Sequence, residues 1–121
     1  MKPYVLVVED NADLRTSYMD ALALDGVASV SAIHGRQALD LLENIKDLPR
    51  IVLLDMMMPV MDGWAFLEER SKDPRLFAIP VIVCSAVRSR ALPNNTFFLR
   101  KPVELETLLE KIHDLFSAKN T

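Results

Sequence analysis

The stretch Tyr4-Val5-Leu6-Val7-Val8-Glu9-Asp10, a short apolar run that ends in two carboxylates, decides the fold. Three later apolar runs, at residues 51–54, 81–84 and 96–99, are likewise followed by polar residues: Asp55, Ser85, and Arg100-Lys101-Pro102. Short apolar runs that alternate with helical patterns indicate buried strands of a parallel sheet. Ligands of such sheets bind outside the carboxyl ends of the strands. We therefore expect three carboxylates, a hydroxyl and a lysine to meet at one edge, where crowded carboxylates would call for a metal ion.

Helical patterns fill the intervals between these runs. The first helix is expected to be capped by Asn11 or Asp13, to turn Leu14, Tyr18 and Leu22 inward, and to stop at Asp25-Gly26. A weaker alternation predicts a second strand over 28–33. Further helices are expected over 35–48, from 63 to about 72 with a stop at Asp73-Pro74, and over 103–118. The sequence therefore predicts an α/β fold, a doubly wound five-stranded parallel sheet with helices on both faces.

The interval between Ser85 and Lys101 departs from this rhythm because it holds only 15 residues (101 − 85 − 1). A strand of ~5 residues and two connections of ~4 leave too few for an average helix of ~11. Pro93 would also break a helix, and Asn94-Asn95 is typical of a turn. We expect at most one or two helical turns between Val87 and Leu92, and hence a shortened or irregular fourth helix.

Composition restricts the class of protein. The 121 residues fit one domain, residues 1–121, and no further domain is expected after the last helix. No apolar stretch approaches the ~20 residues of a membrane span. The net charge of −3 and the lack of a basic block argue against direct nucleic-acid binding. The N-terminus lacks a signal-peptide pattern and Cys84 is the single cysteine, so we expect a cytoplasmic protein.

The polar strand ends together suit phosphoryl transfer. Mg²⁺ takes oxygen ligands, keeps several waters and often sits beside a phosphate, so Glu9, Asp10 and Asp55 could hold it. Without a cation the three carboxylates would repel one another, and the pKa of at least one should rise. A carboxylate beside Mg²⁺ can attack a phosphoryl group and form an acyl phosphate. Lys101 and Ser85 would then contact the remaining phosphoryl oxygens.

These motifs resemble those of the receiver domains of two-component response regulators, and the resemblance covers nearly the whole chain. The stretches that carry it are Val7-Val8-Glu9-Asp10-Asn11, residues 55–63 (Asp-Met-Met-Met-Pro-Val-Met-Asp-Gly), residues 79–86 (Ile-Pro-Val-Ile-Val-Cys-Ser-Ala) and Lys101-Pro102. The resemblance implies a flavodoxin-like sheet of strand order 2-1-3-4-5. It also implies that the chain is a phosphoacceptor rather than an enzyme, although it assists its own phosphorylation and dephosphorylation.

The resemblance further implies a role for each site residue. Asp55 would be the phosphoacceptor and, with Asp10, a direct ligand of Mg²⁺; the backbone carbonyl of Met57 would complete the protein ligands, and Glu9 would bind through water. Ser85 would be the switch hydroxyl and Lys101 the phosphate-contacting lysine. Phe98 falls on the family's aromatic switch position, and the Lys101-Pro102 bond is usually cis in the family.

Two functions remain open from the sequence. The first is a phosphorylation-dependent switch, in which a sensor histidine kinase or phosphotransfer protein supplies the phosphoryl group and a protein target, not identified by the sequence, reads the result. The second is a constitutive interaction module that has lost switching, which the shortened fourth helix suggests. An FMN carrier is set aside because no phosphate loop follows the first strand, and a haloacid-dehalogenase-type phosphatase because its second Asp is Met57 here. The expected state is a monomer or weak dimer.

Overall fold

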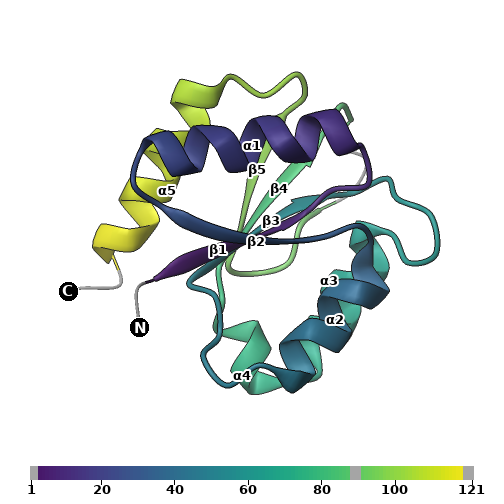
Figure 1. Cartoon of the computed structure of the whole chain (residues 1–121). Coiled ribbons are helices and arrows are strands. Elements are labelled where there is room, and N and C mark those ends of the chain that lie inside the picture. Colours follow the sequence, from purple (N-terminus) through teal and green to yellow (C-terminus); the bar gives the residue numbers. More distant parts are fainter. Residues whose placement is uncertain (1–2, 88–90, 119–121) are drawn as a thin grey trace.

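The sheet has the predicted order. The structure, a computed structural model, describes residues 3–87 and 91–118. Its five parallel strands run in the order β2-β1-β3-β4-β5 (Figure 1). Their bounds are β1 (Tyr4–Val8), β2 (Ala28–Ala32), β3 (Ile51–Asp55), β4 (Val81–Ser85) and β5 (Thr96–Arg100). Val8 pairs with Leu54, Asp55 with Cys84, and Ser85 with Arg100, so the carboxyl ends of β1, β3, β4 and β5 lie side by side.

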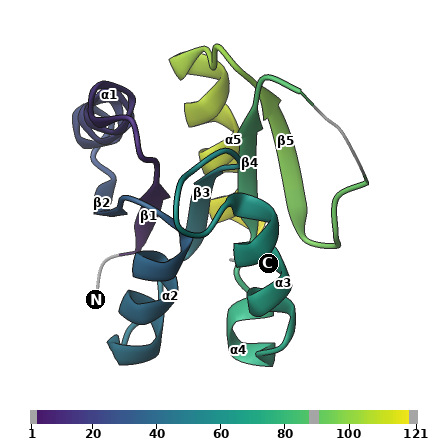
Figure 2. The ribbon, with the colours of Figure 1, turned by 90° about the vertical axis from the view of Figure 1, so that its right-hand side faces the viewer.

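Helices cover both faces of the sheet, as Figures 1 and 2 show. α1 (Ala12–Leu24) and α5 (Leu105–Ala118) lie on one face, and α2 (Gly35–Asn44), α3 (Gly63–Ser71) and the short α4 (Pro74–Phe77) lie on the other. Alternate strand residues feed two separate cores, because successive side chains point to opposite faces. Val7 and Leu53 pack toward α1 and α5, while Val8 and Leu54 pack toward α2 and α3.

The first two helices differ from prediction in detail. Asn11, one of the two predicted caps, accepts a hydrogen bond from the backbone N–H of Leu14 and starts α1. Tyr18 and Leu22 are buried as predicted, but Leu14 is exposed because the first turn of α1 stands at the carboxyl edge of the sheet. The helix predicted over 35–48 ends early, at Asn44, because Ile45 is extended. The segment that follows α2 is held by a hydrogen bond from β1: the Tyr4 hydroxyl donates to the Asp47 carbonyl.

The sequence analysis missed α4. The sequence predicts that the third helix stops at Asp73-Pro74, and α3 does end at Ser71 with Lys72 as its C-cap. The same pair also starts a helix: the Asp73 side chain accepts a hydrogen bond from the backbone N–H of Arg75, and Pro74 takes the first helical position. Aspartate at the N-cap and proline at the next position are favourable start signals, and both were present in the sequence.

The connection from β4 to β5 carries no helix in its described residues, 86–87 and 91–95. The helical turns predicted between Val87 and Leu92 lie partly outside the described residues. The connection enters β5 through Asn95, whose φ of 63° is left-handed, as the predicted turn chemistry allows. The last helix begins at Leu105 rather than near residue 103.

Buried Arg70 ties this side of the fold together. The side chain, 1% exposed, comes from the end of α3. Its Nη2 donates to three backbone carbonyls that lie 7, 9 and 25 residues further along the chain: Phe77 (3.2 Å), Ile79 (3.0 Å) and Asn95 (3.2 Å). The guanidinium also stacks over the Phe77 ring, 4.8 Å from its centroid. Arg70 thereby joins α3, the segment after α4 and the entry to β5.

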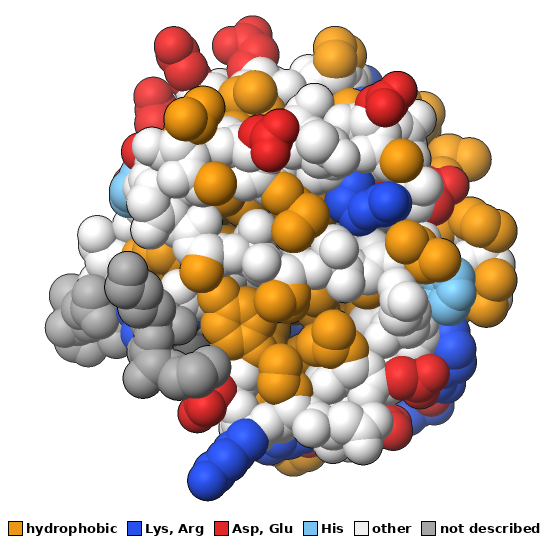
Figure 3. All heavy atoms as spheres, viewed as in Figure 1, with side chains coloured by type: hydrophobic (Ala, Val, Ile, Leu, Met, Phe, Trp, Pro, Cys, Tyr) orange, Lys and Arg blue, Asp and Glu red, His pale blue; other side chains and the backbone are white. Residues whose placement is uncertain are grey.

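The outer surface is mixed. Figure 3 shows the face that carries α1 and β2: hydrophobic side chains gather in its middle, around the edge strand, and acidic side chains lie toward its top. The three central residues of β2 are half-buried, which accords with an edge strand that the helices cover only in part. Among the described residues, no helix combines the length and the apolar character that crossing a membrane requires.

Candidate functional site at the carboxyl edge of the sheet

Three carboxylates converge where the central strands end. Glu9 follows β1 and is 2% exposed, Asp55 ends β3 and is 5% exposed, and the neighbouring Asp10 is exposed. Each offers one oxygen atom, and these three atoms lie within 4.8 Å of one another. The convergence predicted from the strand ends is therefore present. An all-oxygen donor set with one open side fits a hard divalent cation that keeps part of its water shell.

Lys101 supplies the positive charge of the site. Its Nζ lies 3.1 Å from an oxygen of Glu9 and 3.1 Å from an oxygen of Asp55. Burial favours the neutral amine, but the hydrogen bonds and charges of the two carboxylates outweigh it and raise the pKa of Lys101. One ammonium therefore serves two buried carboxylates, and the exposed Asp10 adds a third acidic group.

The pKa of Glu9 is raised, as the crowding argument predicts for at least one carboxyl. The largest cause is burial, however, and repulsion from Asp55 is a smaller one. The backbone N–H of Asn11 donates to Glu9 at 3.2 Å and, together with Lys101, counteracts the rise. Burial is thus the main reason that the pKa of Glu9 is raised, and the hydrogen bonds from Asn11 and Lys101 offset it only in part.

Two nearby residues were missed by the sequence analysis as parts of the site. The sequence analysis assigns Asn11 a role as a helix cap and a place in the first family motif but no role in the site, yet its N–H donates to the Glu9 side chain. Arg15, one turn into α1, donates from Nη1 to the Glu9 backbone carbonyl at 2.9 Å. The available signal was an arginine about one helical turn after the acidic pair Glu9-Asp10. Because Arg15 contacts the backbone of Glu9, it holds the loop in position and does not pair with the Glu9 carboxylate.

Ser85 lies at the end of β4, 7% exposed. Its hydroxyl donates to the Val87 carbonyl at 2.9 Å and accepts from the Val87 N–H at 3.3 Å. The backbone carbonyl of Ser85 accepts a hydrogen bond from the backbone N–H of Lys101 at 2.9 Å. This backbone hydrogen bond connects the two residues whose side chains supply the hydroxyl and the ammonium. The Lys101-Pro102 peptide is cis. Phe98 is half-buried in β5 and packs against the core on the α2 and α3 side.

These groups line an open cavity of about 260 Å³. Its lining residues are Glu9, Asp10, Asn11, Leu14, Asp55, Met57, Ser85, Ala86 and Lys101. The Asp55 carboxylate accepts a hydrogen bond from the Met57 N–H at 3.3 Å, and the Met57 side chain stands outward, 78% exposed. The predicted site residues are thus in one cavity except for Phe98, which is not among its lining residues.

A model of the response regulator receiver domain matches residues 5–113, almost the whole of the described chain. The chain belongs to the response regulator receiver domain family. As a receiver domain it is a signalling domain, and its five-stranded sheet of order 2-1-3-4-5 is that of its structural neighbours. The receiver domain of Francisella response regulator 1452 superposes with a TM-score of 0.86 at 25% identity, over 98% of this chain and 99% of that one.

Three other proteins are also similar to this chain. The receiver domain of a signal transduction histidine kinase from Syntrophus aciditrophicus has a TM-score of 0.87 at 24% identity, over 96% of this receiver and 91% of that chain, and supports the fold. Response regulator MprA of Mycolicibacterium vanbaalenii is 33% identical over 115 residues, 92% of this receiver and 49% of MprA. Sensor histidine kinase TmoS of Ectopseudomonas mendocina is 32% identical across 98% of this receiver and 12% of TmoS. These curated relatives are at least twice as long as the part that this chain matches.

Proposed function

We propose that this receiver accepts a phosphoryl group on Asp55 and so acts as a switch in a two-component phosphorelay. One observation carries the proposal: in a chain of this family, the buried Asp55 carboxylate lies 3.1 Å from Lys101 and shares its cavity with Glu9, Asp10 and Ser85. A nucleophile, an acidic metal-binding group, a cation and a hydroxyl are the parts that the reaction needs.

The transfer step follows from these groups. A carboxylate oxygen of Asp55 bonds to phosphorus as the bond from phosphorus to a histidine nitrogen of the donor breaks; the leaving imidazole keeps the electron pair and takes up a proton from solvent. Lys101 contacts one phosphoryl oxygen. Asp10, Asp55 and the Met57 carbonyl would hold Mg²⁺ directly, and Glu9 would hold it through water. Bound Mg²⁺ supplies positive charge for the phosphoryl oxygens.

The switching step starts at Ser85. In the described state its hydroxyl is hydrogen-bonded to the backbone of Val87. We propose that, after phosphorylation, the hydroxyl donates to a phosphoryl oxygen instead and draws the end of β4 toward Asp55. Phe98, two strands from Asp55 and half-buried, would change its packing in response. The changed surface would signal through protein–protein contacts, with a histidine kinase or phosphotransfer protein upstream.

The test is intact-mass analysis after incubation with acetyl phosphate and Mg²⁺. The wild-type protein should gain the mass of one phosphoryl group, and the gain should disappear with EDTA or after hydroxylamine, which cleaves acyl phosphates. Asp55→Asn should gain nothing, whereas Asp62→Asn, an exposed aspartate seven residues later, should behave as wild type. A stable adduct on Asp55→Asn, or no Mg²⁺-dependent adduct on the wild type, would refute the proposal.

A second function keeps one supporting observation. The described residues of the β4–β5 connection form no helix, so the segment that follows Ser85 departs from the regular receiver pattern. A constitutive interaction module would retain the fold without a response to phosphate. The same experiment distinguishes the two functions when the amide nitrogen–proton NMR spectrum is added: a switch predicts shifts along β4 and β5 on phosphorylation, and a constitutive module predicts none beyond the loop at Asp55.

A further inference from the structure

Two of the three carboxylates of the acidic site belong to one short loop. Glu9 and Asp10 lie between the end of β1 and the start of α1, which Asn11 caps, so the sheet and the helix fix the two ends of the loop. The Glu9 N–H donates to the Ala32 carbonyl of β2 at 3.1 Å, which continues the strand pairing by one residue. The path of the backbone at Asp10 depends on further contacts.

Arg15 supplies these contacts. Its Nη1 donates to the Glu9 carbonyl at 2.9 Å and makes a longer contact of 3.5 Å with the Asp10 carbonyl. The backbone N–H of Arg15 donates to the Asn11 carbonyl at 2.9 Å, so the half-buried side chain reaches back from one turn into α1. Residues 9–15 thus form a closed ring, in which a helix side chain holds the backbone of the loop that leads into the helix.

The Asp10 carboxylate depends on this ring for its direction. Glu9 and Asp55 are each held at the side chain by Lys101, whereas Asp10 is exposed and stands outside that pairing. An aspartate carboxylate is joined to its backbone through one CH₂ group, so a single staggered torsion and the backbone itself decide where it points. Whatever holds the backbone at Asp10 therefore decides whether this carboxylate faces Asp55.

We infer that Arg15 is a positioning residue of the metal site, which keeps the Asp10 carboxylate within reach of an ion held beside Asp55. The inference rests on the proposed function, in which these two carboxylates bind Mg²⁺ directly. Groups that orient metal ligands from outside the coordination sphere commonly change metal affinity by about 10–100-fold when they are removed.

The positive charge of Arg15 acts on a bound cation in the opposite direction. A guanidinium hydrogen-bonded beside a cation site repels the ion, so loss of the charge alone would strengthen metal binding. Loss of the hydrogen bonds to the loop would weaken metal binding, because the Asp10 carboxylate would no longer be held toward Asp55. The sign of the change in affinity on Arg15→Met therefore distinguishes positioning from a simple effect of charge.

The test compares the Mn²⁺ affinity of the full chain and three variants by electron paramagnetic resonance. Arg15→Met should weaken binding about tenfold, the low end of the usual range, because Arg15 holds backbone and not the carboxylate itself. Arg15→Lys keeps the charge but replaces the planar fork by one ammonium, so its affinity should lie between the two. Arg50→Met removes the same charge from another half-buried arginine, at the amino end of β3, and should bind as wild type.

A second measurement separates positioning of the metal ligand from damage to the transfer step. The rate of phosphorylation by acetyl phosphate is followed by intact mass as the Mg²⁺ concentration is raised. Arg15→Met should need more Mg²⁺ for its half-maximal rate. Its maximal rate at saturating Mg²⁺ should match the wild type, because Asp55 and Lys101 are unchanged.

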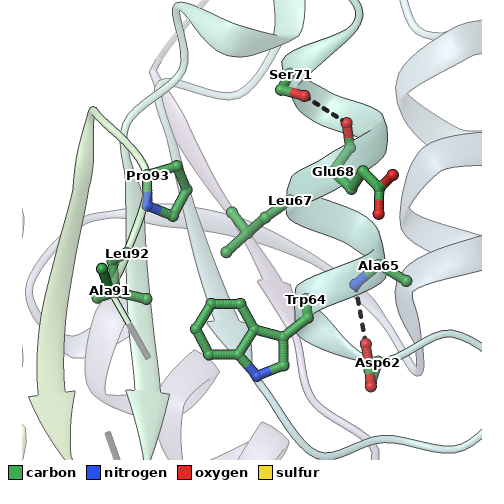
Figure 4. A pocket seen from close by; sticks show the side chains of 9 residues that line it. All are labelled: Asp62, Trp64, Ala65, Leu67, Glu68, Ser71, Ala91, Leu92 and Pro93. Atoms are coloured by element: carbon green, nitrogen blue, oxygen red, sulfur yellow. Dashed lines mark hydrogen bonds between the residues drawn. The ribbon is translucent and has the colours of Figure 1, made fainter. Parts of the chain in front are cut away.

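Trp64 shows whether each variant is folded. It is the single tryptophan of the chain and lies on α3, across the sheet from α1. It lines a separate cavity of about 530 Å³ between α3 and residues 91–93, where its indole and the Leu67 side chain point toward Leu92 and Pro93 (Figure 4). Its emission therefore reports the fold from a place remote from the loop, and it should be the same in all the variants.

Several outcomes overturn the inference. If Arg15→Met binds Mn²⁺ as tightly as the wild type or more tightly, Arg15 does not position the ligand, although the proposed function stands. Equal losses in Arg15→Met and Arg50→Met, or a lower maximal rate at an unchanged Mg²⁺ requirement, have the same meaning. Should Arg15→Met fail to fold, Arg15→Lys decides, and the wild-type affinity in that variant overturns the inference. A wild type that binds no Mn²⁺ overturns both the inference and the metal site of the proposed function.

Discussion

At the scale of single residues, the site is organised by a shortage of positive charge. Lys101 is shared between Glu9 and Asp55, and Asp10 stands outside that pairing, exposed at the open side of the cavity. A cation that keeps its waters would enter from this side. Asp10 should therefore matter more to metal binding than Glu9, which already has hydrogen bonds from Lys101 and the Asn11 N–H.

The first prediction concerns this difference. Asp10→Ala should abolish Mn²⁺ binding measured by electron paramagnetic resonance, with Mg²⁺ as the competing ion. Glu9→Ala should weaken binding without abolishing it, because Glu9 acts through water in the proposed site. Asp13→Ala, an exposed acid in the first turn of α1, is the control and should bind as wild type. Tight binding that survives Asp10→Ala would contradict the assignment.

The second prediction concerns the lifetime of the phosphorylated state. Hydrolysis of an acyl phosphate needs a water held in line behind phosphorus, and polar side chains beside the site usually orient it. The positions two residues after Asp55 and Ser85 are Met57, 78% exposed, and Val87, 65% exposed; neither side chain accepts a useful hydrogen bond. The phosphorylated protein should thus be long-lived, and Met57→Asn should speed its decay.

The measurement is the decay of phosphorylated protein followed by mass spectrometry under saturating Mg²⁺. Val60→Asn is the matched control because Val60 is equally exposed in the same loop but does not line the cavity. Its φ of 70° also suits asparagine, so the substitution adds no backbone strain. A wild type that loses phosphate as fast as Met57→Asn would refute the argument.

At the scale of elements, the side of the sheet without a long fourth helix depends on Arg70. One buried nitrogen donates to carbonyls from the end of α4, the segment between α4 and β4, and the turn before β5. A hydrogen bond from a charged donor stabilises more than a neutral one, while burial of the guanidinium costs free energy and lowers its pKa. The two effects oppose each other. If the side chain were replaced, the Ile79 carbonyl would lose its donor, whereas the Phe77 carbonyl also accepts from Asn95 Nδ2 and the Asn95 carbonyl from the Val81 N–H.

The third prediction follows. Arg70→Met should lower the free energy of unfolding by about 2 kcal/mol, because a buried carbonyl without a donor costs that order of free energy. Lys72→Met removes a cation two residues further on, where its pair with Glu69 is exposed and screened by solvent, and should therefore cost much less than Arg70→Met. Urea unfolding of both variants gives the comparison. Equal losses would mean that Arg70 does not tie these elements together.

At the scale of the whole molecule, the acidic site sets a balance between stability and function. The folded state brings Glu9, Asp10 and Asp55 together, which the unfolded chain does not. Anything that binds the folded state alone stabilises it by mass action. Mg²⁺ should therefore raise the melting temperature, and Asp55→Asn should stabilise the metal-free protein more than the Mg²⁺-loaded one.

The fourth prediction is the matching pH dependence in EDTA. Because the folded-state pKa of Glu9 is raised above its ordinary 4.5, the folded protein binds the Glu9 proton more tightly than the unfolded chain does. The Glu9 contribution should therefore lower stability as pH rises from about 4.5 through the raised value, and it should be constant above it. The difference between the urea midpoints of the wild type and of Glu9→Gln, measured across this pH range, isolates this contribution. If the wild type instead became more stable relative to Glu9→Gln as the pH rises, the sign of the effect would be reversed and the prediction contradicted.

Much of this receiver could be predicted from local sequence. The strands are recognisable because each is a short apolar run closed by a polar residue, and parallel pairing then brings residues 9, 10, 55, 85 and 101 to one edge. Their proximity is a consequence of topology, so it needed no knowledge of packing. The roles of these residues and of Phe98 remain proposals for experiment.

Other features were decided only by tertiary structure. α2 ends at Asn44 although the apolar pattern continues, and Leu14 is exposed although its spacing points inward. The carbonyls that Arg70 joins come from residues 7, 9 and 25 positions away, and the cavity beside Trp64 exists because α3 and residues 91–93 meet with no helix described between them. Periodicity reports which face of a segment is apolar. What covers that face depends on the neighbouring elements, so their arrangement in space decides it.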